Sequence, residues 1–322
     1  MHSSAATQTD APRTLPWYVA VLHGLGGLFA GGFLISFFFV TLLGDLSPPA
    51  FGVTGAILIG GATAVAWFQS HSFVRLFALS FSLAGHAALG SYFEESFEFD
   101  GLVAGMVPLS VGLYALYRDS LHRFLSVLGT LVLVAAWILE GETVDPNAVH
   151  GILLLVSAAT VWSFGAAVPG YVRPAGYAAM IVMLALPLLT LSHGDIDWSA
   201  ARIVAVLFAL AVLWLLRRAY PTFKGVSFAA AAVGAVAVGA VTTPGLGLAA
   251  GVLVIGFWRG ERLMTALGLL FLPLFLVVFY YDLELSLLQK SFMLMAGGTL
   301  MLCLRQALVL WDRIRNSVGI MS

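Results

Sequence analysis

Long apolar stretches separated by short polar loops run along the whole chain. A helix that crosses a bilayer needs roughly 20 consecutive apolar residues, and stretches near that length recur about twelve times. The pattern predicts an all-α, polytopic integral membrane protein, a helical bundle of about 12 transmembrane helices. The predicted spans are 17–43, 50–68, 73–92, 101–117, 121–139, 149–168, 174–192, 199–216, 226–242, 245–258, 262–281 and 286–304.

The loops between these spans alternate in charge. Short loops rich in Lys and Arg stay in the cytoplasm, so the alternation predicts an inner-membrane protein with both termini inside (N-in and C-in). The basic positions are Arg13, Arg75, Arg118, Arg123, Arg173, Arg217, Arg218, Lys224, Arg259, Arg262, Arg305, Arg313 and Arg315. The acidic positions of the intervening loops are Asp45, Glu94, Glu95, Glu98, Asp100, Glu140, Glu142, Asp145, Asp195, Asp197, Asp282 and Glu284.

The ninth and tenth predicted spans are short, and only Thr243 and Pro244 separate them. They could form one broken or re-entrant unit, but the basic loops would then change sides after it. Two separate helices preserve the alternation of charge to the end of the chain, so we predict two.

Composition agrees with a membrane protein and limits the other classes. The chain has 322 residues, of which 61% are hydrophobic and 10% charged, too few polar residues to cover a soluble core of this size. Its Arg residues are spread over many loops rather than gathered in one stripe, which argues against nucleic-acid binding. The predicted organisation is a disordered cytoplasmic tail at 1–15, a transmembrane domain at 16–308 and a short cytoplasmic tail at 309–322.

Few ionisable side chains fall inside the predicted spans. His23 lies in the first and His86 in the third. A histidine at membrane depth could relay protons, because its charge changes near neutral pH, or it could be a neutral packed residue that donates to a carbonyl. No carboxylate lies near the middle of a predicted span, which favours the packed residue.

The most polar segment is 280–291, which joins the last two predicted spans on the acidic side. Lys290 lies about one turn into the last span, on the side where Lys is disfavoured, with Asp282 or Glu284 as its expected partner. The segment is either a site for an anionic or amine-bearing ligand, or a loop held by a snorkelling Lys. The candidate residues here are Tyr281, Asp282, Glu284 and Lys290.

The loop 93–100 alternates acidic and aromatic residues. Its carboxylates, Glu94, Glu95, Glu98 and Asp100, are either a partner-binding surface or a solvated acidic loop. The sequence contains no zinc-protease, hydrolase or P-loop motif, so we expect no enzymatic activity, no cofactor and no metal site.

Both ends of the chain carry motifs that resemble a known family. They are Pro16-Trp17-Tyr18-Val19 before a Gly-rich helix, and Tyr280-Tyr281, Leu285, Leu287-Leu288, Lys290-Ser291, Gly297-Gly298 and Arg305 near the C-terminus. They resemble an uncharacterised bacterial membrane family, the domain of unknown function number 4401. The resemblance implies a bacterial inner membrane and two partners, a periplasm-facing protein with a GDYxxLxY motif and a second multi-helix membrane protein. It supplies no reaction.

These observations favour a subunit of a membrane complex that engages a periplasm-facing partner through its acidic outer loops and segment 280–291. The alternative is a secondary transporter or a lipid-handling protein, which predicts a polar cavity near the middle of the bilayer. The lipid bilayer is an expected partner in both cases.

Overall fold

The structure of the chain is a computed structural model. The model describes residues 17–38, 47–68, 72–117, 119–140, 145–165, 168–190, 198–223 and 225–282, with isolated positions beyond 282. The predicted tails and the last predicted span, 286–304, lie outside these ranges.

Every regular element in the described ranges is helical, and the helices lie within a few residues of the predicted stretches. Thr242 and Thr243 separate α8 from α9. A break at this point fits both a broken unit and two separate spans, so the choice of two spans stays a prediction. The elements are α1 (Trp17–Phe38), α2 (Pro48–Phe68), α3 (Ser72–Leu116), α4 (Ser120–Glu140), α5 (Pro146–Gly165), η2 (Gly170–Val172), α6 (Arg173–Leu189), α7 (Trp198–Ala219), α8 (Val226–Val241), α9 (Pro244–Arg259) and α10 (Arg262–Asp282).

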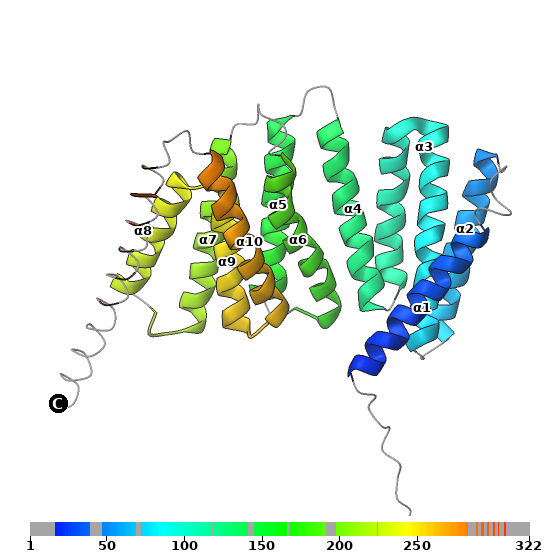
Figure 1. Ribbon diagram of the computed structural model, residues 1–322, viewed down its shortest axis with the longest axis horizontal. Coiled ribbons are helices and arrows are strands. Elements are labelled where there is room, and N and C mark those ends of the chain that lie inside the picture. Colours follow the sequence, from blue (N-terminus) through cyan, green and yellow to red (C-terminus); the bar gives the residue numbers. More distant parts are fainter. Residues whose placement is uncertain are drawn as a thin grey trace, which may run out of the picture.

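The helices stand side by side in a broad row, from α1 and α2 (blue) at one end to α8 at the other (Figure 1). Their directions alternate, so the Arg-bearing helix ends lie along one edge of the row. These are the starts of α3, α4, α6 and α10 and the ends of α7 and α9. We call this the basic edge. The alternation of charge in the sequence thus becomes a separation of charge in space.

One prediction about α3 was wrong. We expected the acidic segment 93–100 to be a loop between two spans, but helix continues through it and is interrupted only at Glu98. Glu98 has φ 61° and ψ −170°, a combination that is nearly restricted to glycine and costs of the order of 1–3 kcal/mol elsewhere. This single residue turns α3 into two antiparallel limbs, residues 72–97 and 99–116 (Figure 1).

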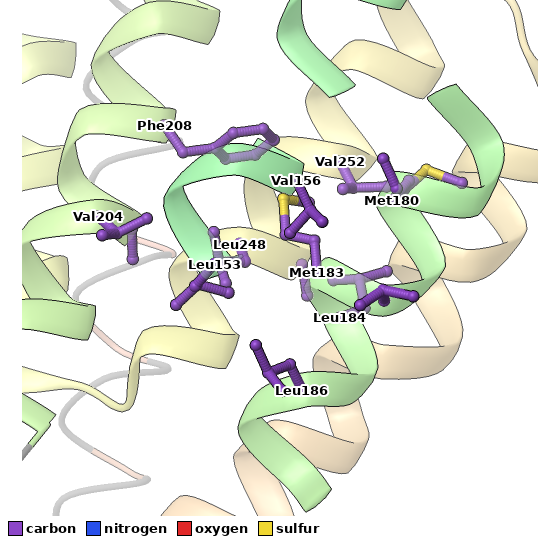
Figure 2. Close-up of a cluster of buried hydrophobic side chains, with 14 of the residues drawn as sticks. Leu153, Val156, Met180, Met183, Leu184, Leu186, Val204, Phe208, Leu248 and Val252 are labelled. Carbon is purple, nitrogen blue, oxygen red and sulfur yellow. The ribbon is translucent and has the colours of Figure 1, made fainter. Parts of the chain in front are cut away.

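Large apolar side chains fill the space among α5, α6, α7 and α9 (Figure 2). Met183, Leu184 and Leu248 are completely buried there. Interdigitated side chains of this kind gain dispersion contacts that survive in a bilayer, where the hydrophobic effect no longer drives helices together.

Small residues bring α1 and α2 against the first limb of α3. A Cβ placed on Gly55 would lie 2.8 Å from the carbonyl oxygen of Gly85, and one on Gly27 would lie 2.9 Å from that of Phe73. Backbones can approach this closely only without a side chain between them. Both glycines therefore serve packing inside the bundle.

In the part of the chain that the structure describes, six helical segments are long and apolar enough to cross a membrane by length and composition. Many large apolar side chains also point outward, such as Phe33, Phe68 and Phe257, which are 75%, 86% and 69% exposed. Exposed apolar surface on this scale suits a lipid environment rather than water. These findings indicate a membrane protein, whereas the total of about twelve spans and the inside position of the termini stay predictions.

Candidate functional site

A buried polar cluster lies where the first limb of α3 meets the start of α4. Its members are Ser82 and His86 on α3 and His122 and Ser126 on α4, and we call them the histidine cluster. Ser82 is fully buried and His122 is 2% exposed. Buried polar groups in an apolar bundle are costly unless they are paired, so their bonding decides what the cluster can do.

Both ring nitrogens of His122 contact hydroxyl groups. Nε2 lies 2.9 Å from Ser82 Oγ, and Nδ1 lies 3.2 Å from Ser126 Oγ. A hydroxyl can donate to a bare ring nitrogen or accept from a protonated one. His122 therefore keeps two partners as either neutral tautomer and as the imidazolium, a property that a pair of carbonyl partners would not allow.

His86 is bonded on one side only. Its Nδ1 donates to the backbone carbonyl of Ser82, 2.6 Å away, while its Nε2 is buried without a hydrogen-bond partner among the described residues. Donation at Nδ1 leaves Nε2 of the neutral ring as an acceptor. The rings of His86 and His122 are 6.0 Å apart between centroids, and Ser82 contacts both of them.

Tyr117, in the short connection between α3 and α4, covers His122 from one side. The two rings are stacked with 3.7 Å between centroids and 7° between planes. Burial, helped by the charge of the nearby Asp119 carboxylate, raises the pKa of Tyr117 to about 12. The phenol therefore stays protonated at physiological pH and can donate to the carbonyl oxygen of Ala62, 3.4 Å away.

Asp119 fixes the start of α4 and therefore the position of His122. Its Oδ1 accepts from the backbone N–H of Leu121 at 2.9 Å and of His122 at 3.2 Å, the geometry of a helix N-cap. Its other oxygen forms an ion pair with Arg75 at the start of α3. The ion pair joins the two helices that carry the cluster, at the basic edge.

The cluster borders a pocket of about 330 Å³ between the two limbs of α3 and α4. His86, midway along the first limb, and His122 both line it, and we call it the histidine pocket. Three further polar side chains on its wall are Ser110, Ser126 and Thr130. The same three also line a second pocket, of about 400 Å³, that extends toward Trp162 and Val172. One strip of hydroxyl groups thus borders both pockets.

The histidine pocket offers hydrogen-bonding groups to a small polar molecule. Its wall can accept a hydrogen bond at His86 Nε2 and can exchange hydrogen bonds at its hydroxyl groups. Among the described residues, no three His, Cys, Asp or Glu side chains come together as a metal site requires.

Of the two histidines named from the sequence, His86 lies in this site. Its bond to the Ser82 carbonyl matches the packed alternative, and its place on the pocket wall matches the functional one. His23 lies in α1, and its side chain is outside the described residues.

The other candidates lie elsewhere. Tyr281 is 77% exposed at the end of α10, and Asp282 is the last residue of that helix. Glu284, Lys290 and Arg305 fall outside the described residues. Their predicted roles, and the predicted Lys290 pairing, stay predictions.

The acidic candidates gather at the turn of α3, at the edge opposite the basic one. Glu94, Glu95, Glu98 and Asp100 are all exposed there. Asp100 also accepts a hydrogen bond from Trp137 Nε1 on α4, at 2.7 Å. The turn therefore presents a carboxylate-rich surface that is tied to α4.

Sequence reasoning missed His122, Ser82, Ser126, Tyr117 and Asp119. A usable signal existed, because Ser82-His86 and His122-Ser126 are each four residues apart, which puts both members on one face of an apolar helix. Each pair alone is weak. The two pairs meet only because the first limb of α3 packs near the start of α4. Helical spacing alone does not predict which helices pack together.

A family model described as Domain of unknown function (DUF4401) matches residues 16–310. The chain belongs to this family. No curated protein and no solved structure matches it. Membership in the DUF4401 family therefore assigns no activity to the chain.

Proposed function

We propose that this protein is a secondary transporter that conducts protons, and that the histidine pocket is its binding site. The observation that carries the proposal is the pair His86 and His122 on the wall of a pocket inside an apolar helical bundle. Ionisable groups at such positions are expensive and mark ion or substrate pathways more often than packing. The hydroxyl strip shared with the second pocket supports a route that continues past the site.

Proton movement through purified protein tests this proposal. Proteoliposomes that contain a pH-sensitive dye are given a potassium diffusion potential, and internal acidification is followed. We expect proton uptake above that of protein-free liposomes, and loss of most of it in both His86→Gln and His122→Gln, because an amide cannot carry a proton in this range.

His150→Gln is the matched control, since His150 is a half-buried histidine on α5 that lines neither of these pockets. It should retain the wild-type rate. Uptake equal to that of empty liposomes, or uptake that neither cluster variant changes, contradicts the proposal.

The proposed location is the bacterial cytoplasmic membrane with the basic edge inside. In a Cys303→Ser background, a cysteine at Asp145 should react with a membrane-impermeant maleimide in intact cells. A cysteine at Tyr220, beyond the basic end of α7, should react only after permeabilisation. The reverse pattern rules out this orientation.

A second function is supported by the exposed turn of α3. Glu98 holds a strained backbone that glycine would adopt freely, next to exposed Glu94 and Glu95. A carboxylate at such a position on an exposed turn suggests a surface that binds a partner, and the family resemblance points to a periplasm-facing protein. In this second function the chain is a complex subunit.

Crosslinking in native membranes followed by affinity purification tests the subunit function. The Glu94→Gln/Glu95→Gln/Glu98→Gln variant should lose a partner that the wild type retains. Glu140→Gln, an exposed carboxylate at the same edge on α4, should retain it. A wild-type chain that purifies alone after crosslinking excludes this function.

A further inference from the structure

A long apolar groove runs along the outside of the bundle between α5 and α7. It has a volume of about 450 Å³ and is lined by one face of each helix, from Leu154 to Gly165 and from Val204 to Arg218. Leu154, Trp162 and Leu207 on its wall are 49%, 57% and 51% exposed, so the groove is accessible from the surroundings of the bundle.

The dimensions of the groove match one leaflet of a bilayer. At 1.5 Å per helical residue, the stretch from Val204 to Arg218 is about 21 Å long. One leaflet contributes about 15 Å of hydrocarbon, and its headgroup layer adds several ångströms. A single acyl chain that lies along α7 would therefore reach from mid-bilayer to the headgroups beside Arg218.

The polar end of the groove is basic. Arg218 lines it, and its guanidinium carbon lies 5.4 Å from the centre of the Trp214 ring, which also lines the groove. Both residues are in the last two turns of α7, at the basic edge. Trp favours the headgroup layer of a bilayer, and a guanidinium binds phosphate through two parallel hydrogen bonds.

We propose that this groove is a specific site for one anionic phospholipid. An acyl chain lies between Ala158 and Ala211, whose small side chains keep the middle of the groove open, and the phosphate group binds Arg218. Charge complementarity selects an anionic headgroup over a zwitterionic one. The site is separate from the histidine pocket and depends on no assumption about transport.

Lipid retention by the purified full chain tests the proposal. The probes are dioleoyl phosphatidylglycerol and dioleoyl phosphatidylcholine, added at equal concentration to delipidated protein in detergent. Native mass spectrometry counts bound lipid, and tryptophan fluorescence follows thermal unfolding. We expect one retained phosphatidylglycerol per chain and a higher unfolding temperature with it than with phosphatidylcholine.

Arg218→Gln should weaken phosphatidylglycerol retention about tenfold, the size expected for loss of a charge-assisted hydrogen bond. Arg259→Gln is the matched control, because Arg259 also stacks on a tryptophan, Trp258, at the basic end of a helix but does not line the groove. It should bind as the wild type does.

Ala211→Phe fills the groove and should abolish lipid retention, because the acyl chain no longer fits. Ala64→Phe, on the exposed face of α2, should retain lipid as the wild type does. Unchanged phosphatidylglycerol retention in Arg218→Gln overturns the proposal, as does equal retention of phosphatidylcholine by the wild type. Proton uptake that persists in Arg218→Gln proteoliposomes shows that the two sites act independently.

Discussion

Two regions of the helical row are packed in different ways. Around α1, α2 and α3, glycines let backbones approach closely, and the buried polar groups of the histidine cluster lie between α3 and α4. Around α5, α6, α7 and α9, completely buried Leu, Met and Val side chains interdigitate (Figure 2). The buried polar side chains on α5 and at the end of α6 carry only hydroxyl groups, at Ser157, Thr160, Ser163 and Thr190.

The two regions therefore hold their helices together in different ways. Helices in lipid are held by close packing and by hydrogen bonds rather than by the hydrophobic effect. The first region uses short backbone distances and hydroxyl–imidazole contacts, and a pocket survives beside them. The second region fills its interior with large side chains, which makes it a rigid neighbour for a region that carries ionisable groups.

The largest expected effect lies in the apolar region. Leu248→Ala removes a completely buried side chain on α9, and the transfer and cavity costs should lower the free energy of unfolding by about 2–5 kcal/mol. Leu270→Ala on α10, where the side chain is 62% exposed, should cost far less. Unfolding by SDS titration in mixed micelles measures both, and equal losses would mean that Leu248 is not in a packed core.

Close packing in the small-residue region is tested on one helix. Gly55→Val pushes a branched side chain into the backbone of α3, and we expect a loss of about 3 kcal/mol in the free energy of unfolding. Gly60→Val adds the same side chain to α2 where nothing lies within 4 Å, and it should change stability little. If the same titration shows that both variants are tolerated, α2 and α3 do not approach as described.

Alanine substitution of one buried serine in each region compares how much a buried hydroxyl group stabilises that region. Ser82→Ala leaves Nε2 of His122 without its partner and should cost about 2 kcal/mol. Ser157 on α5 is also buried, but its hydroxyl has no hydrogen-bond partner in the described structure, so Ser157→Ala should be neutral or slightly stabilising. Matching losses in chemical unfolding would remove the contrast between polar and apolar regions.

The smallest effect concerns the junction at Asp119. Asp119→Asn keeps the N-cap of α4 but loses the ion pair with half-exposed Arg75, which should cost about 0.5 kcal/mol. Asp119→Ala loses the cap as well and should cost about 1 kcal/mol more. The difference between the two unfolding free energies isolates the cap, and no difference would mean that the side chain does not cap α4.

Much of the helical content followed from composition alone. The apolar stretches predicted α2, α4, α5 and α10 within a few residues, because a span needs a fixed length of apolar sequence and ends where polar residues begin. The chain reversal within α3 was predicted at 93–100, but as a loop. The helical form of this segment and the break at Glu98 were not predicted, since an acidic segment is typical of a loop and nothing in it requires a left-handed residue. No pairing was predicted for Asp119 or Glu261, which lie in basic loops. Asp119 forms an ion pair with Arg75, and Glu261 forms one with Arg173.

The sequence by itself determined that the chain is a helical protein with a membrane-like distribution of apolar residues, and that its charges alternate from loop to loop. These are properties of short windows, and hydrophobicity and helix length act within such windows. Only the tertiary structure decided that Ser82 and His86 meet His122, that hydroxyl groups surround an imidazole, and that α5 and α7 leave a groove ending at Arg218. His122 lies 40 positions from Ser82 and 36 from His86, and the two walls of the groove come from separate helices. These contacts depend on which helix faces pack together, and no local pattern encodes that.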